Sequence, residues 1–181
     1  MEKKTENNID ILYNKYAHSL FSYALSLGFD RETAMDAIHD IFCKLCAKER
    51  LFDSIDNIRF YLFRSLKNRL LDIHKQTKTF SKFARTSADL PFTINISIED
   101  ELIEFEDGEQ VKRKISKMLE KLTNRQREII YLRYTQECSY EEISGLMNIT
   151  IPACRKLMHK SLSKLRESQL SVIILLSAIS C

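Results

Sequence analysis

The 181-residue chain has very few of the residues that interrupt helices or make tight turns. It contains three glycines, two prolines and no tryptophan. A sandwich or barrel of many strands needs a turn every few residues, so this scarcity argues against those folds and favours long helices. With 44% hydrophobic and 29% charged residues, the chain can still bury a core in one domain or in two small ones.

Signs of secretion are also missing. The five cysteines are an odd number scattered along the chain, and the N-terminal sequence MEKKTENNID has no apolar run of a signal peptide. We therefore expect a reduced, cytoplasmic setting without a disulfide framework. The apolar tail 169–181 is too short to span a membrane as a helix. It is expected to extend the last helix and pack on the second domain, or else to form a surface for a partner.

Motifs of catalysis are absent as well. The sequence has no glycine-rich phosphate loop, no nucleophile elbow and no convergent pair of acids with a histidine. We therefore expect a protein that is not an enzyme, with no metal or small cofactor and no small-molecule substrate.

Apolar side chains recur at helical spacing in three stretches of the first half. These stretches cover residues 12–27, 34–45 and 58–73, which predicts three amphipathic helices. Gly28 is expected to end the first helix and Asp30 to cap the second. We interpret residues 6–76 as one compact helical domain.

The predicted second helix also carries a polar stripe. Asp36, Asp40 and Lys44 follow one another at intervals of four residues, on the side opposite the apolar residues. The sequence suggests no internal partner for this stripe, so we expect it to face solvent or another protein.

The charge of the chain reverses after this domain. Seven basic residues and one acid lie from Arg64 to Arg85, whereas eight acids and no lysine or arginine lie from Asp89 to Glu109. Within the acidic stretch, TINISI (93–98) alternates like a strand but has no partner strand in the sequence. We interpret residues 77–109 as an extended acidic linker, able to dock in the groove of another protein.

Residues 139–165 have the pattern of a helix-turn-helix motif. A short helix (140–146), a tight turn (147–149) and a longer helix (151–165) are predicted, with capping boxes starting at Thr123 and Ser139 and an N-cap at Thr150. Basic residues line the outer face of the longer helix, which would fit the major groove of DNA. A solvated basic helix end is the alternative reading of the same charges.

These motifs resemble those of extracytoplasmic-function (ECF) RNA polymerase sigma factors of the sigma-70 family. LTNRQREIIYLRY with SYEEISGLMNITIPACRKLMHKSLSKL is similar to the family's fourth conserved region, AMDAIHDIFCKLC (34–46) to its polymerase-contacting helix, and NRLLDIHK (68–75) to the end of its promoter-melting helix. The resemblance implies an all-α, two-domain protein: region 2 in 6–76, a linker in 77–109 and region 4 in 110–168. Met35, His39 and Cys46 depart from the family's usual acid, glutamine and tryptophan.

The resemblance also implies partners and contact residues. Core RNA polymerase would be bound through its beta-prime clamp helices and beta flap, with the linker in a polymerase channel. An anti-sigma factor would hold the protein inactive. The residues that match the family's clamp-binding helix are Asp36, Asp40, Phe42, Lys44 and Leu45.

Promoter DNA is the second implied partner. The loop 47–57 and the following Arg59, Phe60 and Tyr61 match the site that holds a flipped base of the minus-ten element, although one or two of Phe60, Tyr61 and Phe63 are expected in the core. Asn68, Arg69 and Asp72 match the residues along the promoter strand, with Lys75 as an alternative partner for Asp72. The residues that match the reader of the minus-thirty-five element are Thr150, Pro152, Arg155, Lys156, His159 and Lys160.

Two other functions remain open at this point. His39, Cys43 and Cys46 have the HxxxCxxC spacing of zinc-binding anti-sigma proteins, with His18 as a conceivable fourth ligand, which would indicate a redox-sensing interaction protein. The C-terminal half alone would also suit a helix-turn-helix regulator that acts without polymerase.

Overall fold

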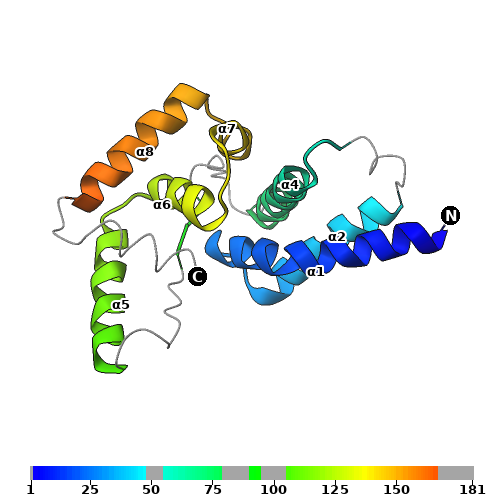
Figure 1. Ribbon diagram of the computed structural model, residues 1–181, viewed down its shortest axis with the longest axis horizontal. Helices are drawn as coiled ribbons and strands as arrows, with labels where there is room; N and C mark the ends of the chain where they lie inside the picture. Colours follow the sequence, from blue (N-terminus) through cyan, green and yellow to red (C-terminus); the bar gives the residue numbers. More distant parts are fainter. Residues whose placement is uncertain (1, 48–54, 79–89, 95–104, 167–181) are drawn as a thin grey trace. The chain divides into compact units, whose positions relative to one another are not determined.

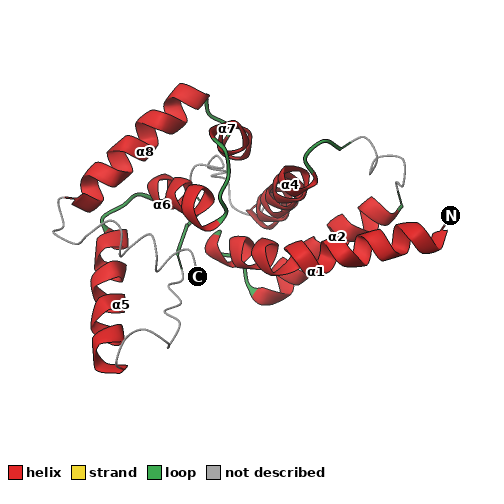
Figure 2. Cartoon of the chain, viewed as in Figure 1, coloured by secondary structure: helices red, strands yellow, loops and turns green. Residues whose placement is uncertain are grey.

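The computed structural model describes residues 2–47, 55–78, 90–94 and 105–166 (Figure 1). All regular structure within these ranges is helical, as Figure 2 shows, so the predicted all-α class is confirmed. The chain divides into two compact units, residues 1–90 and 91–181. The apolar tail 169–181, the central part of the loop 47–57 and most of the acidic linker lie outside the described residues.

The first unit contains three long helices that pack on one another. They are α1 (Glu2–Ser26), α2 (Arg31–Cys46) and α4 (Ile58–Lys78). The side chains in the centre of this unit are almost completely buried, among them Leu20, Tyr23, Ile38, Leu62, Leu66 and Leu70. The rings of Tyr23 and Phe63 join α1 to α4, with 5.5 Å between their centroids.

The turn between α1 and α2 forms as the sequence predicts. Gly28 has φ = 84°, a left-handed conformation that glycine adopts at little cost, and the Phe29 N–H donates to the Ala24 carbonyl at 3.3 Å. The Asp30 carboxylate then accepts from the Thr33 N–H and hydroxyl, each at 2.8 Å. These hydrogen bonds hold the pKa of Asp30 below its ordinary value.

The second unit is a set of shorter helices. They are α5 (Phe105–Glu120), α6 (Asn124–Ile130), its π-helical continuation η2 (Tyr131–Thr135), α7 (Tyr140–Met147) and α8 (Ile151–Arg166). Both predicted capping boxes are present: Thr123 exchanges hydrogen bonds with Gln126, and Ser139 with Glu142. The helix α5 begins at Phe105, five residues before the predicted start near Gln110.

One part of the predicted linker is held by the second unit of its own chain. The Phe92 side chain is 2% exposed, and its ring lies 5.5 Å from that of Tyr131. The Phe92 carbonyl accepts from Arg127 Nε at 2.6 Å, while the other guanidinium nitrogens of Arg127 donate to the Leu119 carbonyl and to Asn124 Oδ1. Phe92 and Ile94 therefore pack within their own chain, whereas most of the strand-like stretch 93–98 lies outside the described residues.

Replacing Phe92 with leucine should lower the free energy of unfolding of the second unit by about 1 kcal/mol. Leucine keeps most of the buried apolar volume but loses the edge-to-face contact with Tyr131. Urea unfolding followed by far-UV circular dichroism would measure the loss. Thr93→Ala, at the exposed neighbouring position, serves as the control. Equal stability of the Phe92 variant and wild type would show that the segment is not held by this ring.

Candidate functional site

The turn between α7 and α8 is fixed from both sides. Asn148 adopts the left-handed conformation (φ = 52°, ψ = 51°), and its N–H donates to the Ser144 carbonyl. The Ser144 hydroxyl donates to the Ile149 carbonyl at 2.5 Å, and Arg125 Nη2 of α6 donates to the Met147 carbonyl at 3.1 Å. The predicted tight turn is thus present, and its contacts fix the direction in which α8 leaves it.

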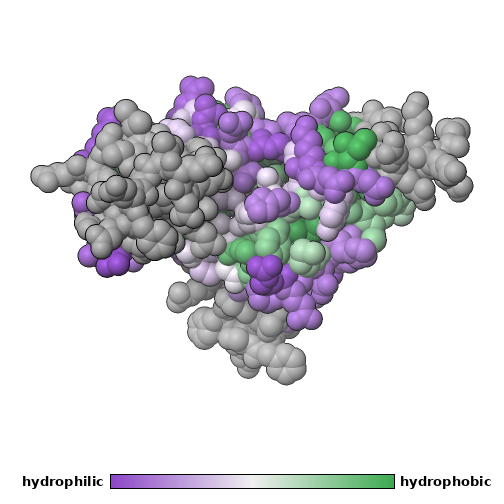
Figure 3. Space-filling view, turned by 60° about the horizontal axis from the view of Figure 1, so that its bottom comes forward, coloured by the Kyte–Doolittle hydropathy of each residue, from purple (hydrophilic) through white to green (hydrophobic). Residues whose placement is uncertain are grey.

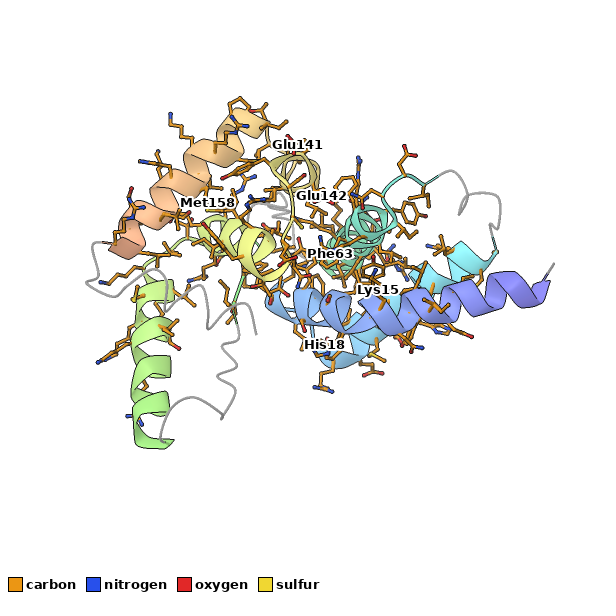
Figure 4. All side chains as sticks on the ribbon, in the orientation of Figure 1. Lys15, His18, Phe63, Glu141, Glu142 and Met158 are labelled. Carbon is orange, nitrogen blue, oxygen red and sulfur yellow. The ribbon has the colours of Figure 1, made fainter. Side chains whose placement is uncertain are left out.

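One face of α8 packs inward and the other faces solvent. The buried residues are Cys154, Met158, Ser161 and Leu165, and Figure 4 shows Met158 on the side of α8 that faces α6. Burial raises the pKa of the Cys154 thiol, so this side chain behaves as an uncharged part of the core. All six residues expected to read the upstream promoter element are exposed: Thr150, Pro152, Arg155, Lys156, His159 and Lys160.

The guanidinium group of Arg155 is positioned by an aromatic ring. Its Cζ lies 5.6 Å from the centroid of the Tyr140 ring, and Cζ of Arg133 lies 5.2 Å from the same centroid. Glu141 follows Tyr140, and its pKa is lowered mainly by its backbone N–H and the Ser139 side chain, with smaller contributions from Arg155 and Arg133. Figure 4 shows Glu141 on α7, beside the start of α8. The sequence singled out neither Tyr140 nor Arg133, because only the fold brings them to Arg155.

A shallow cleft of about 250 Å³ follows the α8 face toward α6. Its apolar lining comes from Ile149, Ala153 and Leu157, and its cations are Arg125, Lys156 and Lys160. Sequence reasoning missed Arg125, which belongs to α6 and reaches α8 only through the fold. A cationic cleft beside an exposed helix face suits the phosphate backbone of DNA.

In the first unit, the residues expected on the polymerase-contacting helix divide into two groups. Asp36 and Lys44 are exposed and Asp40 is half-exposed, whereas Phe42 and Leu45 are 5% and 1% exposed. The Phe42 ring packs edge-on against Tyr13 of α1, with 5.0 Å between centroids. The surface that α2 offers to a partner therefore includes its polar stripe but excludes the side chains of Phe42 and Leu45.

The polar stripe has an internal partner after all. Asp40 Oδ2 lies 2.7 Å from Arg69 Nη2 of α4, and both side chains are about two-fifths exposed. The expectation that the stripe has no internal partner was wrong at this position, because helices far apart in sequence meet there. The pair connects a residue expected to contact polymerase with one expected to contact DNA.

Two arginines of α4 lie over aromatic rings of the same helix. Cζ of Arg59 lies 5.5 Å from the Phe63 ring and Cζ of Arg64 lies 5.9 Å from the Phe60 ring. Phe63 is buried, while Phe60 and Tyr61 are partly exposed, which agrees with the expectation that at least one aromatic is core. Asn57, the last residue of the predicted loop 47–57, accepts the Phe60 N–H through its side-chain oxygen at 2.9 Å.

Two further α4 residues were expected along the promoter strand. Asn68 and Asp72 are both exposed. Asp72 lies 3.7 Å from Lys75, the alternative partner that the sequence suggested, in a solvent-exposed ion pair. Such a pair is weak in water, so it leaves the carboxylate able to exchange partners.

Comparison with known families agrees with this arrangement. The description "Sigma-70 region 2" matches residues 12–79, and "Sigma-70, region 4" matches residues 112–165. The two matches fall on the two helical units in the order that the motifs predicted. The chain belongs to the sigma-70 family. As a sigma factor, it binds core RNA polymerase and promoter DNA and directs the initiation of transcription.

Two similar proteins are sigma factors, and one of them is named as an ECF sigma factor. The ECF RNA polymerase sigma factor SigM of Bacillus subtilis (strain 168) is 22% identical over 167 residues, covering 87% of this chain and 93% of SigM. The RNA polymerase sigma factor YlaC of the same organism is 25% identical over 181 residues, covering 92% of this chain and 98% of YlaC. The structure of CnrH in complex with the cytosolic domain of CnrY shares the fold. The TM-score is 0.54 and the sequence identity is 18%. The match covers 90% of this chain and 87% of the chain in that structure.

The zinc site considered as an alternative finds no support in the described part of the sigma factor. His39 Nε2 and Cys43 Sγ are 3.3 Å apart. Within the described ranges, however, no group of three or more histidine, cysteine, aspartate or glutamate side chains could hold a metal ion.

Among the residues that the structure describes, no helix is both long and apolar enough to cross a membrane.

Proposed function

We propose that the exposed face of α8 reads the upstream, minus-thirty-five element of the promoter. The observation that carries this proposal is the set of exposed polar side chains along that face. The turn that precedes α8 is fixed by hydrogen bonds from α7 and α6, so the direction of this face is fixed too. The N-terminal part of such a helix enters the major groove, where Arg155 can donate two hydrogen bonds to a guanine. Lys160, further along α8 and lining the cationic cleft, contacts a phosphate.

Region 2 supplies the other contacts. The exposed part of the α2 stripe docks on the clamp helices of the polymerase beta-prime subunit. The partly exposed rings of Phe60 and Tyr61 stack on a base of the minus-ten element, and the cations Arg59 and Arg64 of the same helix follow the DNA backbone. Asn68, Arg69 and Asp72 of α4 line the separated strand. The Asp40–Arg69 ion pair supports this division of roles, because it joins the docking helix to the melting helix.

The protein acts in the cytoplasm, without catalytic residues or a cofactor, since polymerase performs the chemistry. An anti-sigma factor controls it by covering one or both units. This partner is inferred from the resemblance to ECF sigma factors, together with a shared fold with CnrH, whose structure was solved in complex with the cytosolic domain of CnrY.

Run-off transcription tests the proposal. Core polymerase with this chain is expected to initiate at discrete positions on a set of genomic fragments, and core polymerase alone is not. The chain would instead be a helix-turn-helix regulator if it met two conditions. It would bind those fragments as tightly without polymerase as with it, and it would add no start sites to those of core polymerase.

Replacing Tyr140 with alanine should relax promoter selectivity by about threefold to tenfold at the base pair that Arg155 reads. The ring lies under the guanidinium group and limits the orientations of its hydrogen-bond donors. Tyr140→Phe keeps the ring and should keep the selectivity. Binding to promoters with each base at that position gives the readout. The alanine change should add nothing to an Arg155→Ala variant, and independent, additive losses would contradict the positioning role.

A further inference from the structure

The outer face of α2 carries a thiol next to an imidazole. Cys43 Sγ lies 3.3 Å from His39 Nε2, and both side chains are exposed. Cys46, the last residue of α2, is also exposed and lies one turn further on. Residues three and four apart are neighbours on a helix surface, so His39, Cys43 and Cys46 follow one another along one side of α2.

The other cysteines that the structure describes are in a different environment. Cys138 is 3% exposed and Cys154 is fully buried, and burial raises the pKa of the Cys154 thiol. A buried neutral thiol is inert, whereas an exposed thiol beside a histidine has the surroundings of a reactive one. The exposure of Cys43 and the imidazole beside it therefore indicate thiol chemistry at this residue.

We propose that Cys43 is a peroxide-reactive thiol and that Cys46 resolves its oxidised form. The His39 imidazole takes the thiol proton, and the Cys43 thiolate attacks one oxygen of a hydroperoxide. The O–O bond breaks, sulfur is oxidised by two electrons to a sulfenic acid, and the leaving oxygen departs as water or alcohol with the proton from His39. The Cys46 thiol then displaces water from the sulfenic acid to form a disulfide.

This disulfide would strain the end of α2. Side chains three apart on a helix have Cβ atoms about 5–6 Å apart, whereas a disulfide needs about 3.8 Å. The last turn must therefore move, and Leu45, which lies between the two cysteines, is 1% exposed in the core. Cys43 follows Asp36 by two turns on the same side of α2. If that side docks on polymerase, as the proposed function holds, oxidation weakens the docking.

Site-resolved mass spectrometry of the reduced full chain, exposed to hydrogen peroxide and the sulfenic-acid trap dimedone, tests the chemistry. Wild type should form the Cys43–Cys46 disulfide, and Cys46→Ser should accumulate the dimedone adduct on Cys43. His39→Gln should lower the rate at which this adduct forms by at least about threefold, because glutamine cannot take the thiol proton. Cys138 and Cys154 are the internal controls and should stay unmodified. Oxidation at Cys43 no faster than that of glutathione, or unchanged by His39→Gln, would overturn the proposal.

Binding of core polymerase to the reduced and oxidised chain tests the consequence. Oxidation should weaken binding at least about tenfold, dithiothreitol should restore it, and Cys43→Ser should bind equally with and without peroxide. Equal binding by the reduced chain and by the chain with the disulfide would overturn the link to docking. Failure of the reduced chain to bind polymerase would refute the proposed function instead, while the dimedone result would still decide the reactivity of Cys43.

Discussion

Replacing Arg155 with alanine is expected to relax selectivity at one base pair of the upstream promoter element by about 10- to 100-fold. The guanidinium group can donate two parallel hydrogen bonds to one guanine, a geometry that a lysine ammonium cannot reproduce. Tyr140 holds this group beside the first turns of α8, so the loss should affect a single position. Arg155→Lys should therefore lose most of the selectivity even though it keeps the charge.

Lys160→Ala should behave differently from Arg155→Ala. A side chain on a phosphate weakens binding to all upstream elements alike and lowers the slope of log affinity against log salt by about one. Holoenzyme binding across a library of upstream elements, at several salt concentrations, separates the two effects. Arg166→Ala, an exposed cation at the far end of α8, is the matched control. If neither variant changes affinity or selectivity, α8 does not read DNA.

Local features of the fold could be predicted from the sequence because they depend on nearby residues. The left-handed Gly28, the Asp30 cap and the two capping boxes each involve atoms at most five residues apart. Helical periodicity also placed Phe42 and Leu45 on the apolar side of α2, and the structure buries both. The family resemblance alone had assigned these two to a docking surface.

Contacts between distant segments could not be predicted in the same way. Arg69 reaches Asp40 across 29 positions of sequence, Arg127 reaches Phe92 across 35, and Arg125 reaches Met147 across 22. Each contact depends on how whole helices pack, which periodicity does not specify. The Asp40–Arg69 pair also changes the interpretation of a candidate site, because a residue expected to contact a partner already has one in its own chain.

The surface of α2 must therefore be tested with residues that are not part of the core. Phe42→Ala would remove a buried ring that packs on Tyr13, and Asp40→Ala would break the ion pair with Arg69. Either change could weaken polymerase binding by disturbing the first unit itself. On the face that Figure 3 shows, hydrophilic residues cover much of the coloured surface, with apolar areas between them. On α2, the apolar side chain of Met35 is 49% exposed.

Asp36 is the more informative position, and Asp36→Lys should weaken binding of core polymerase about 10- to 100-fold. The carboxylate is exposed on the side of α2 that we propose docks on polymerase, so reversing its charge would place a cation against the receiving surface while leaving the core intact. Asp10→Lys makes the same charge change at an exposed position on α1 and should bind like wild type. Titration of labelled chain with core polymerase gives the affinities, and matching thermal unfolding of the two variants shows that the first unit is equally folded. If Asp36→Lys and Asp10→Lys bind polymerase equally well, the stripe on α2 is a solvated charged face and the docking surface lies elsewhere on the sigma factor.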